Sequence, residues 1–183
     1  MLGLVITFSQ DHSAAFGLVG FGAFAIVTAA VLLASGLRAD RGERGLVLVQ
    51  GVVTAVAGIA ALLLPNGGVG YLVPVVSAWA ILTGALEAVN GIRFRRARIA
   101  GRDWLVTGVL TAALGLVLLL VPQGYADAYS VEDKSGVISG TVTADILLVG
   151  ILGAWAIIVG VQLAIAAFTL RAPRPASAKT VSA

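Results

Sequence analysis

One acidic side chain lies inside a long hydrophobic segment. Glu87 belongs to the apolar run 71–92, and Asn90 follows three residues later, which places both side chains on one face of a helix. An ionisable side chain in such a segment is typical of a proton or ion site. The alternative is a contact with a nearby basic or hydroxyl side chain, namely Arg93, Arg95, Thr107 or Thr111.

Few other residues could perform chemistry. The chain has no cysteine and one histidine, His12, which excludes thiolate chemistry and multi-histidine metal sites. The common nucleophile, phosphate-binding and metalloprotease motifs do not occur in it. Within the acidic loop 123–140, the stretch SVEDKSG lacks the alternating ligands of a calcium loop, so we interpret it as a solvated turn. The sequence therefore predicts no catalytic residue, no cofactor and no metal site, and a protein that is not an enzyme.

The composition is that of a chain with little aqueous surface. Hydrophobic residues make up 59% of the 183 residues and charged residues 11%, against about a quarter charged in soluble domains. The pI near 9.8 comes from basic residues that lie between apolar runs and form no basic face, which argues against nucleic-acid binding. The partner that this composition implies is the lipid bilayer.

Five apolar segments approach or exceed the ~20 residues that a membrane-spanning helix needs. They predict an all-α integral membrane bundle over 14–171, with transmembrane helices at 14–36, 45–64, 71–92, 103–121 and 141–170. Residues 1–13 contain no Lys or Arg, so we expect no cleaved signal peptide. Residues 172–183 are basic and rich in proline and alanine, and we expect a disordered tail.

The basic residues are distributed unevenly between the two sides of this predicted bundle. With five spans, 11 of the 12 Lys and Arg residues lie on one side and only Lys134 lies on the other. The positive-inside rule then puts both basic links and the C-terminus in the cytoplasm. The same rule puts the N-terminal segment and the acidic loop outside.

The chain contains two and a half copies of a two-helix unit. The segments Gly51–Pro65 and Gly108–Pro122 share eight of fifteen residues, including two glycines, a threonine and a proline at equal offsets. The helices that follow them begin alike at Trp79 and Trp155, and a related helix, 24–38, comes before both units. Self-similarity at a fixed spacing is the signature of a repeat architecture.

Small residues of the repeat share one helix face, and close backbone approach across small residues drives helix association in lipid. The residues concerned are Gly51, Thr54, Gly58, Gly108, Thr111 and Gly115. We expect these two stripes to pack against neighbouring helices, with a contact between the stripes themselves as one arrangement. Trp79 and Trp155 lie well inside their spans, away from the interfacial belt, and we interpret them as helix-packing residues.

These motifs resemble the HdeD family. The resemblance is carried by the pattern G-x-x-T-x-x-x-G-x-x-x-L-L-x-P, a short turn, and a following helix that begins with W-A-I and ends at arginine. It covers residues 15–171 and implies a multi-pass protein of the bacterial inner membrane with a role in acid or envelope stress. Family members usually show three full repeats and six spans, whereas this chain has five spans and a longer polar segment in its second unit.

Three functions are consistent with these features. The first is a non-enzymatic HdeD-type protein that contributes to stress tolerance. The second is a small transporter or proton-coupled permease that uses Glu87, which would show a polar cavity at mid-depth. The third is an accessory scaffold of a membrane complex, which would show an exposed face of small residues and bind a second copy or another membrane protein.

Overall fold

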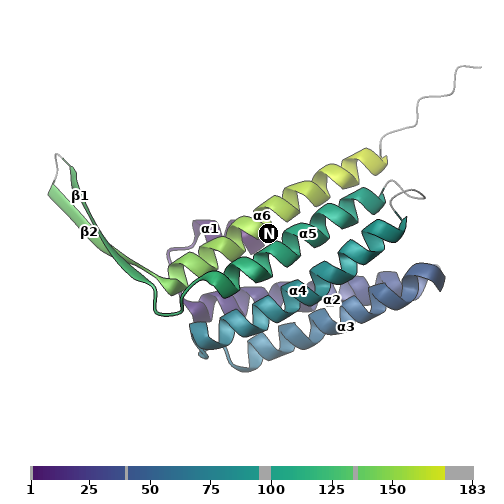
Figure 1. The fold of residues 1–183 in the computed structure, drawn as a ribbon, viewed down its shortest axis with the longest axis horizontal. Coiled ribbons are helices and arrows are strands. Elements are labelled where there is room, and N and C mark those ends of the chain that lie inside the picture. The colour runs from purple at the N-terminus through teal and green to yellow at the C-terminus, as the bar shows by residue number, and fades with distance from the viewer. Residues whose placement is uncertain (1, 40, 95–99, 134–135, 172–183) are drawn as a thin grey trace, which may run out of the picture.

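The computed structural model describes residues 2–39, 41–94, 100–133 and 136–171. Long helices run side by side as a bundle, and two antiparallel strands project from one end of it (Figure 1). In chain order the described elements are α1 (Leu2–Phe8), α2 (Ala14–Arg38), α3 (Arg41–Leu63), α4 (Val69–Phe94), α5 (Ala100–Leu120), β1 (Ala126–Asp133), β2 (Gly136–Thr143) and α6 (Ala144–Arg171).

Five of these helices, α2 to α6, are long and apolar enough to cross a membrane, with mean hydropathies of 1.8 to 2.4. The prediction of an all-α membrane bundle with five spans is confirmed. The boundaries differ by a few residues, and the last helix begins at Ala144 rather than near residue 141. The predicted tail 172–183 lies outside the described residues, as do four basic residues of the predicted links and loop: Arg95, Arg96, Arg98 and Lys134.

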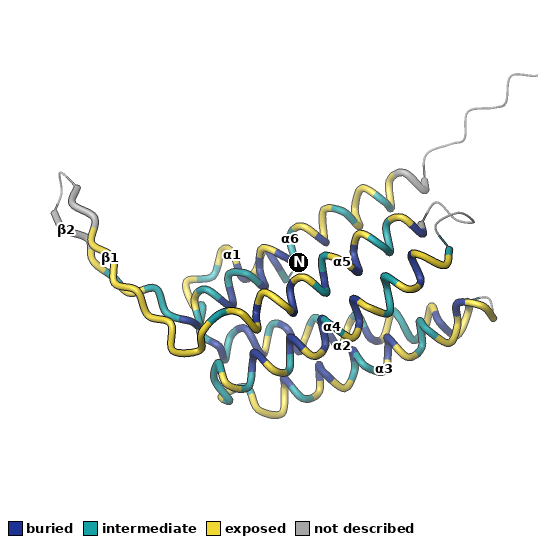
Figure 2. Tube along the Cα trace, viewed as in Figure 1, coloured by how far each residue is buried: buried dark blue, intermediate teal, exposed yellow. Residues whose placement is uncertain are grey.

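Each long helix turns one side toward the bundle interior and another outward, so burial alternates along every helix (Figure 2). Near the strands the interior is made of apolar side chains from α2, α4, α5 and α6. The largest of those that are fully buried are Leu18, Phe21, Leu72, Val76, Leu118, Leu148, Val149 and Leu152. This half of the bundle therefore has an apolar core.

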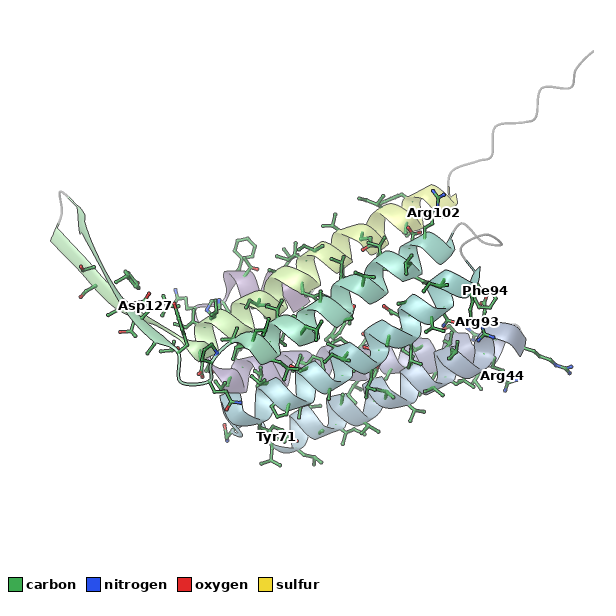
Figure 3. All side chains as sticks on the ribbon, in the orientation of Figure 1. Arg44, Tyr71, Arg93, Phe94, Arg102 and Asp127 are labelled. Carbon is green, nitrogen blue, oxygen red and sulfur yellow. The ribbon has the colours of Figure 1, made fainter. Side chains whose placement is uncertain are left out.

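Charged residues distinguish the two ends of the bundle. Arg44, Arg93 and Arg102 lie together at one end, which we call the basic end, whereas Tyr71 and Asp127 lie at the other, the hairpin end (Figure 3). Helices α2, α4 and α6 run from the hairpin end to the basic end, and α3 and α5 run back.

The most extensive helix contacts join α2 to α3 and α4 to α5, across the two basic links. A Cβ built on Gly84 of α4 would lie 2.5 Å from the backbone nitrogen of Ala112, and one built on Gly108 of α5 would lie 2.5 Å from that of Ala88. Only glycine allows backbones to approach so closely. Each packed pair therefore combines the second helix of one sequence unit with the first helix of the next.

The two stripes of small residues face different neighbours. Gly51 and Gly58 of α3 lie against α2, where a Cβ would meet Leu33 and Ala25 respectively. In α5, Gly108 and Gly115 lie against α4 in the same way. The glycines of each stripe thus pack on the helix that precedes it, and the arrangement in which the stripes contact each other is wrong. The physical reason is that α2 and α4 already occupy those faces.

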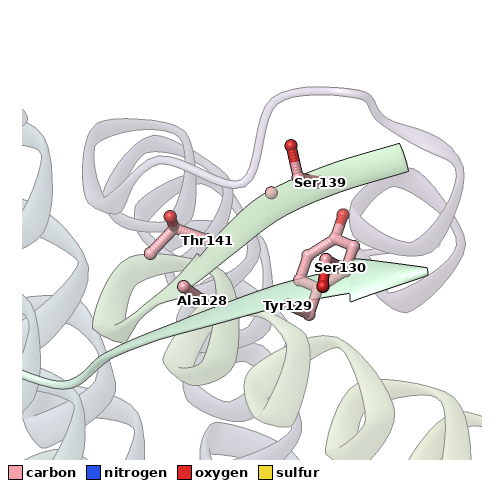
Figure 4. A pocket seen from close by; sticks show the side chains of 6 residues that line it. Ala128, Tyr129, Ser130, Ser139 and Thr141 are labelled. Atoms are coloured by element: carbon pink, nitrogen blue, oxygen red, sulfur yellow. The ribbon is translucent and has the colours of Figure 1, made fainter. Parts of the chain in front are cut away.

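The polar segment 123–140, predicted to be a loop, instead contributes most of a β-hairpin. Strands β1 and β2 pair in register from Ala126↔Thr143 to Asp133↔Gly136. Aromatic and β-branched residues alternate with other residues along this segment, and they favour extended backbone although acidic residues lie among them. The ring of Tyr129 covers Gly140 on the facing strand, where a Cβ would lie 2.6 Å from the tyrosine oxygen (Figure 4).

Helix α1 lies in the segment 1–13, for which the sequence analysis predicted no helix. It packs on α6 near the hairpin end, where a Cβ on Gly3 would lie 2.9 Å from the carbonyl oxygen of Gly153 and Ile6 is buried. Close by, the N–H of Ala14 donates to the Asp145 carboxylate at 3.1 Å. This bond joins the first turn of α2 to the first turn of α6.

Candidate functional site

Four aromatic rings fill the middle of the bundle; we call them the aromatic cluster. Trp79 and Trp155 are 5% and 8% exposed, and their ring centroids lie 5.6 Å apart, edge to face. Phe21 and Phe24 of α2 make edge contacts with Trp79. Because Phe24, Trp79 and Trp155 hold the same position in the three related helices, the repeat itself brings three of these rings together. Such pairs add stability beyond the area that they bury.

The threonines of the two stripes make different hydrogen bonds. The indole Nε1 of Trp79 donates to Thr54 Oγ1 at 3.2 Å, so Thr54 connects α3 to the aromatic cluster. Thr111 Oγ1 donates to the carbonyl oxygen of Thr107 at 2.8 Å, within its own helix. Thr54 provides the acceptor that the buried indole N–H of Trp79 needs, whereas the indole N–H of Trp155 is buried without a partner.

Glu87 lies between the aromatic cluster and the basic end, and its partner is an amide. Gln50 Nε2 of α3 donates to Glu87 Oε1 at 2.7 Å. Within the described part of the chain no ion pair joins Glu87 to a Lys or Arg, and the alternatives that named Arg93, Thr107 or Thr111 are wrong. Arg95, the remaining alternative, lies outside the described residues. Gln50 was missed by sequence reasoning, although it is the only side-chain amide in the predicted span 45–64.

Three oxygen atoms near this bond have no hydrogen-bond partner, although they are buried. They are Glu87 Oε2, Asn90 Oδ1 and Thr107 Oγ1, and we call these three residues the polar site. Asn90 is 3% exposed and Thr107 is 7% exposed. A buried polar atom without a partner is costly and calls for an explanation.

The polar site spans about one helical turn in depth. Asn90 follows Glu87 by three residues on α4, and Thr107 precedes Gly108, whose own Cβ would lie 3.0 Å from the Cβ of Glu87. One turn further along the same contact, Gly91 meets Leu105. Helices α4 and α5 therefore bring the three residues to the same level of the bundle, beside Gln50 of α3.

Other polar side chains lie between the polar site and the basic end. Glu43 of α3 is 5% exposed and lies seven residues before Gln50, on the same helix face. Gln162 of α6 donates to the carbonyl oxygen of Asp103 at 3.2 Å, an interhelical bond. The interior is thus mainly apolar toward the hairpin end, where the hydroxyl of Ser77 is also buried, aromatic in the middle and polar toward the basic end.

Two open hollows lie at the hairpin end. One follows a face of the hairpin, beside Tyr129 and Ser139 (Figure 4). The other lies at the hairpin base, lined by Gln10, His12, Ser13, Thr143, Asp145 and Ile146. Neither hollow is lined by Glu87. In the part of the chain that the structure describes, no group of three or more His, Cys, Asp or Glu could hold a metal ion.

Five long apolar helices and a shared interior define a multi-pass α-helical membrane protein. Residues 49–120, which extend from α3 to the end of α5, match the family described as a short repeat of unknown function (DUF308). The matched region contains both stripes of small residues, Trp79 and the polar site. No curated protein and no solved structure matches the chain.

Proposed function

We propose that this chain is a protein of the bacterial cell membrane, of the HdeD type, that contributes to tolerance of acid or envelope stress without catalysing a reaction. The match of residues 49–120 to DUF308 supports this proposal, because the HdeD family is a DUF308 member. The spacing of glycine, threonine and proline in the repeat and the five long apolar helices support it as well.

In this proposal the basic end faces the cytoplasm. Positive charge is retained on the cytoplasmic side of membrane proteins, and Arg44, Arg93 and Arg102 lie together at that end (Figure 3). The polar site then lies in the cytoplasmic half of the membrane. The hairpin lies on the opposite side.

The observation that carries the acid-stress role is the environment of Glu87. One oxygen of its carboxyl group is bound by Gln50, and the other is buried without a partner. A carboxylate in lipid is stable only when it is paired or neutralised. Cytoplasmic acidification would supply the neutralising proton and change the bond that holds α3 against α4.

A complementation experiment tests this role. A strain that lacks the gene receives the native chain, Glu87→Gln or Gln162→Leu, and survival is counted after acid challenge. Glu87→Gln keeps the size and polarity of the side chain but cannot take up a proton, so we expect protection to be lost. Gln162→Leu removes a different, part-buried amide bond and no titratable group, so protection should persist. Equal protection by Glu87→Gln and the native chain, at equal membrane levels, would refute the role.

A second candidate is a small transporter or proton-coupled permease that uses Glu87. Internal repeats, which are common in transporters, favour it. The aromatic cluster argues against a polar path through the bundle, because it fills the middle with four packed rings. Proton flux into liposomes that contain the native chain, lost in Glu87→Gln, would favour transport over the first proposal.

The third candidate, an accessory scaffold, is favoured by an open face on α6. Alignment of Trp79 with Trp155 makes Gly160 the equivalent of Gly84, yet a Cβ on Gly160 would find nothing within 4 Å. Ala164 on the same face is exposed. The equivalent faces of α2 and α4 each hold a neighbouring helix, whereas α1 covers only the hairpin-end part of this one.

Cysteine crosslinking tests the scaffold directly, because the chain contains no cysteine. Ala164→Cys should form disulfide-linked species in oxidised membranes if a second copy, or a membrane protein with a thiol, covers this face. Ile158→Cys is the matched control, since Ile158 is 54% exposed on another side of α6. Equal crosslinking of both variants would mean random collision and would exclude a specific contact.

A further inference from the structure

The three unpartnered oxygens of the polar site have a chemistry in common. Glu87 Oε2, Asn90 Oδ1 and Thr107 Oγ1 are all electron-pair donors, of carboxylate, amide and hydroxyl type. Such hard oxygen ligands suit hard cations such as the alkali and alkaline-earth ions. Gln50 supplies a single N–H bond to the other carboxylate oxygen and leaves these three atoms unsatisfied.

Charge balance selects among hard cations. Glu87 is the only acidic residue of the polar site, so one positive charge neutralises it and a divalent ion would leave a net charge in an apolar bundle. The acidic groups on the helices packed beside it are Glu43 of α3 and Asp103 of α5, both closer to the basic end. On its own helix the nearest described basic residue, Arg93, makes no ion pair with it.

The two ends of the bundle differ in how an ion could reach the polar site. Toward the hairpin end, the aromatic cluster and an apolar core follow the polar site. Toward the basic end, polar side chains continue at Glu43 and Gln162. A hydrated ion can shed its water stepwise only where polar groups replace that water, so the ion must arrive from the basic end.

We propose that Glu87, Asn90 and Thr107 bind a small monovalent cation, Na⁺, which reaches them from the basic end and competes with the proton for Glu87. The inference rests on the proposed function, because the same carboxyl group takes up the proton. To that function the inference adds the ion that acidification displaces from Glu87. Glu87 and the two neighbouring oxygens bind Na⁺ when the proton concentration is low and release it when Glu87 is protonated.

The test is thermal unfolding of the purified full-length protein in detergent, at one pH and one ionic strength, in NaCl or choline chloride. A ligand that binds only the folded state raises its melting temperature. We expect a higher Tm in NaCl for the native chain, and a smaller difference as the pH is lowered. Glu87→Gln should abolish the difference between the two salts.

Two threonines provide a matched pair of variants. Thr107→Val removes an unpartnered hydroxyl, whereas Thr111→Val, one turn further on the same face, removes one that bonds within its own helix. The NaCl effect should be lost or much reduced in Thr107→Val and in Asn90→Leu, and retained in Thr111→Val. A merely structural role for Thr107 would lower the Tm equally in both salts and overturn the proposal.

The outcomes separate this site from the proposed function. An identical Tm in NaCl and choline chloride for the folded native chain overturns the sodium site. In that case the acid-survival result for Glu87→Gln still decides the proposed function. A sodium effect that requires all three residues, together with unchanged acid survival of Glu87→Gln, supports the site and refutes the stress role.

Discussion

The close contact between α4 and α5 makes Gly84→Ala the most informative single substitution. A Cβ at this position would lie 2.5 Å from Ala112 N and 2.6 Å from the carbonyl oxygen of Gly108. Ordinary van der Waals contact begins near 3.4 Å. Both obstacles are backbone atoms, so no side-chain rotation can relieve the clash and the two helices must separate.

The loss of stability expected for Gly84→Ala follows from overpacking. Forcing an added carbon into a packed contact costs about 1–3 kcal/mol, and the gain of about 0.5–1 kcal/mol from replacing glycine by alanine in a helix offsets part of it. The matched control is Gly160→Ala, at the equivalent position of α6, where a Cβ meets nothing within 4 Å. For this control we expect a stability equal to that of the native chain or slightly higher.

The assay is reversible unfolding of the purified protein in detergent, with helix content followed by circular dichroism. We expect Gly84→Ala to unfold at a clearly lower temperature than Gly160→Ala. If the two variants unfold together, the close approach of α4 and α5 is not a determinant of stability. The assignment of the packed pairs would then be refuted.

Two further predictions concern single hydrogen bonds. Thr54→Val leaves the buried Trp79 N–H without its acceptor and should cost about 1–3 kcal/mol of stability. The same unfolding assay measures the loss, with Thr111→Val for comparison. Equal losses in the two variants would contradict the prediction. Asp145→Ala removes the carboxylate that binds the Ala14 N–H, a charge-assisted bond worth about 1.5–3 kcal/mol. It should speed hydrogen exchange at Ala14, whereas Asp127→Ala on the exposed hairpin should leave that exchange unchanged.

Each packed pair joins the last helix of one sequence unit to the first helix of the next. This arrangement explains why α6 differs from the related helices α2 and α4. In α2 and α4 the face of small residues is covered by the helix that follows across a basic link. No described helix follows α6, and α1 takes part of that place near the hairpin end. The repeat therefore supplies three similar faces, of which the described structure fills two along their length.

Much of the architecture could be predicted from the sequence, because its signals are local. A run of about 20 apolar residues is long enough for a span whatever its neighbours are, and all five spans are present in the structure. The repeat likewise follows from direct comparison of Gly51–Pro65 with Gly108–Pro122. The strands of the polar segment are also signalled locally, by aromatic and β-branched residues that alternate along it.

Only the tertiary structure decided which faces meet. Helical periodicity placed Glu87 and Asn90 on one face, but it could not select Gln50, 37 residues away, as the partner of Glu87. The stripes around Gly58 and Gly115 have similar small residues and would suit several neighbours equally well. In lipid no difference in hydrophobicity chooses among helices, so the choice depends on backbone fit and hydrogen bonds across helices, and these exist only once the bundle has formed.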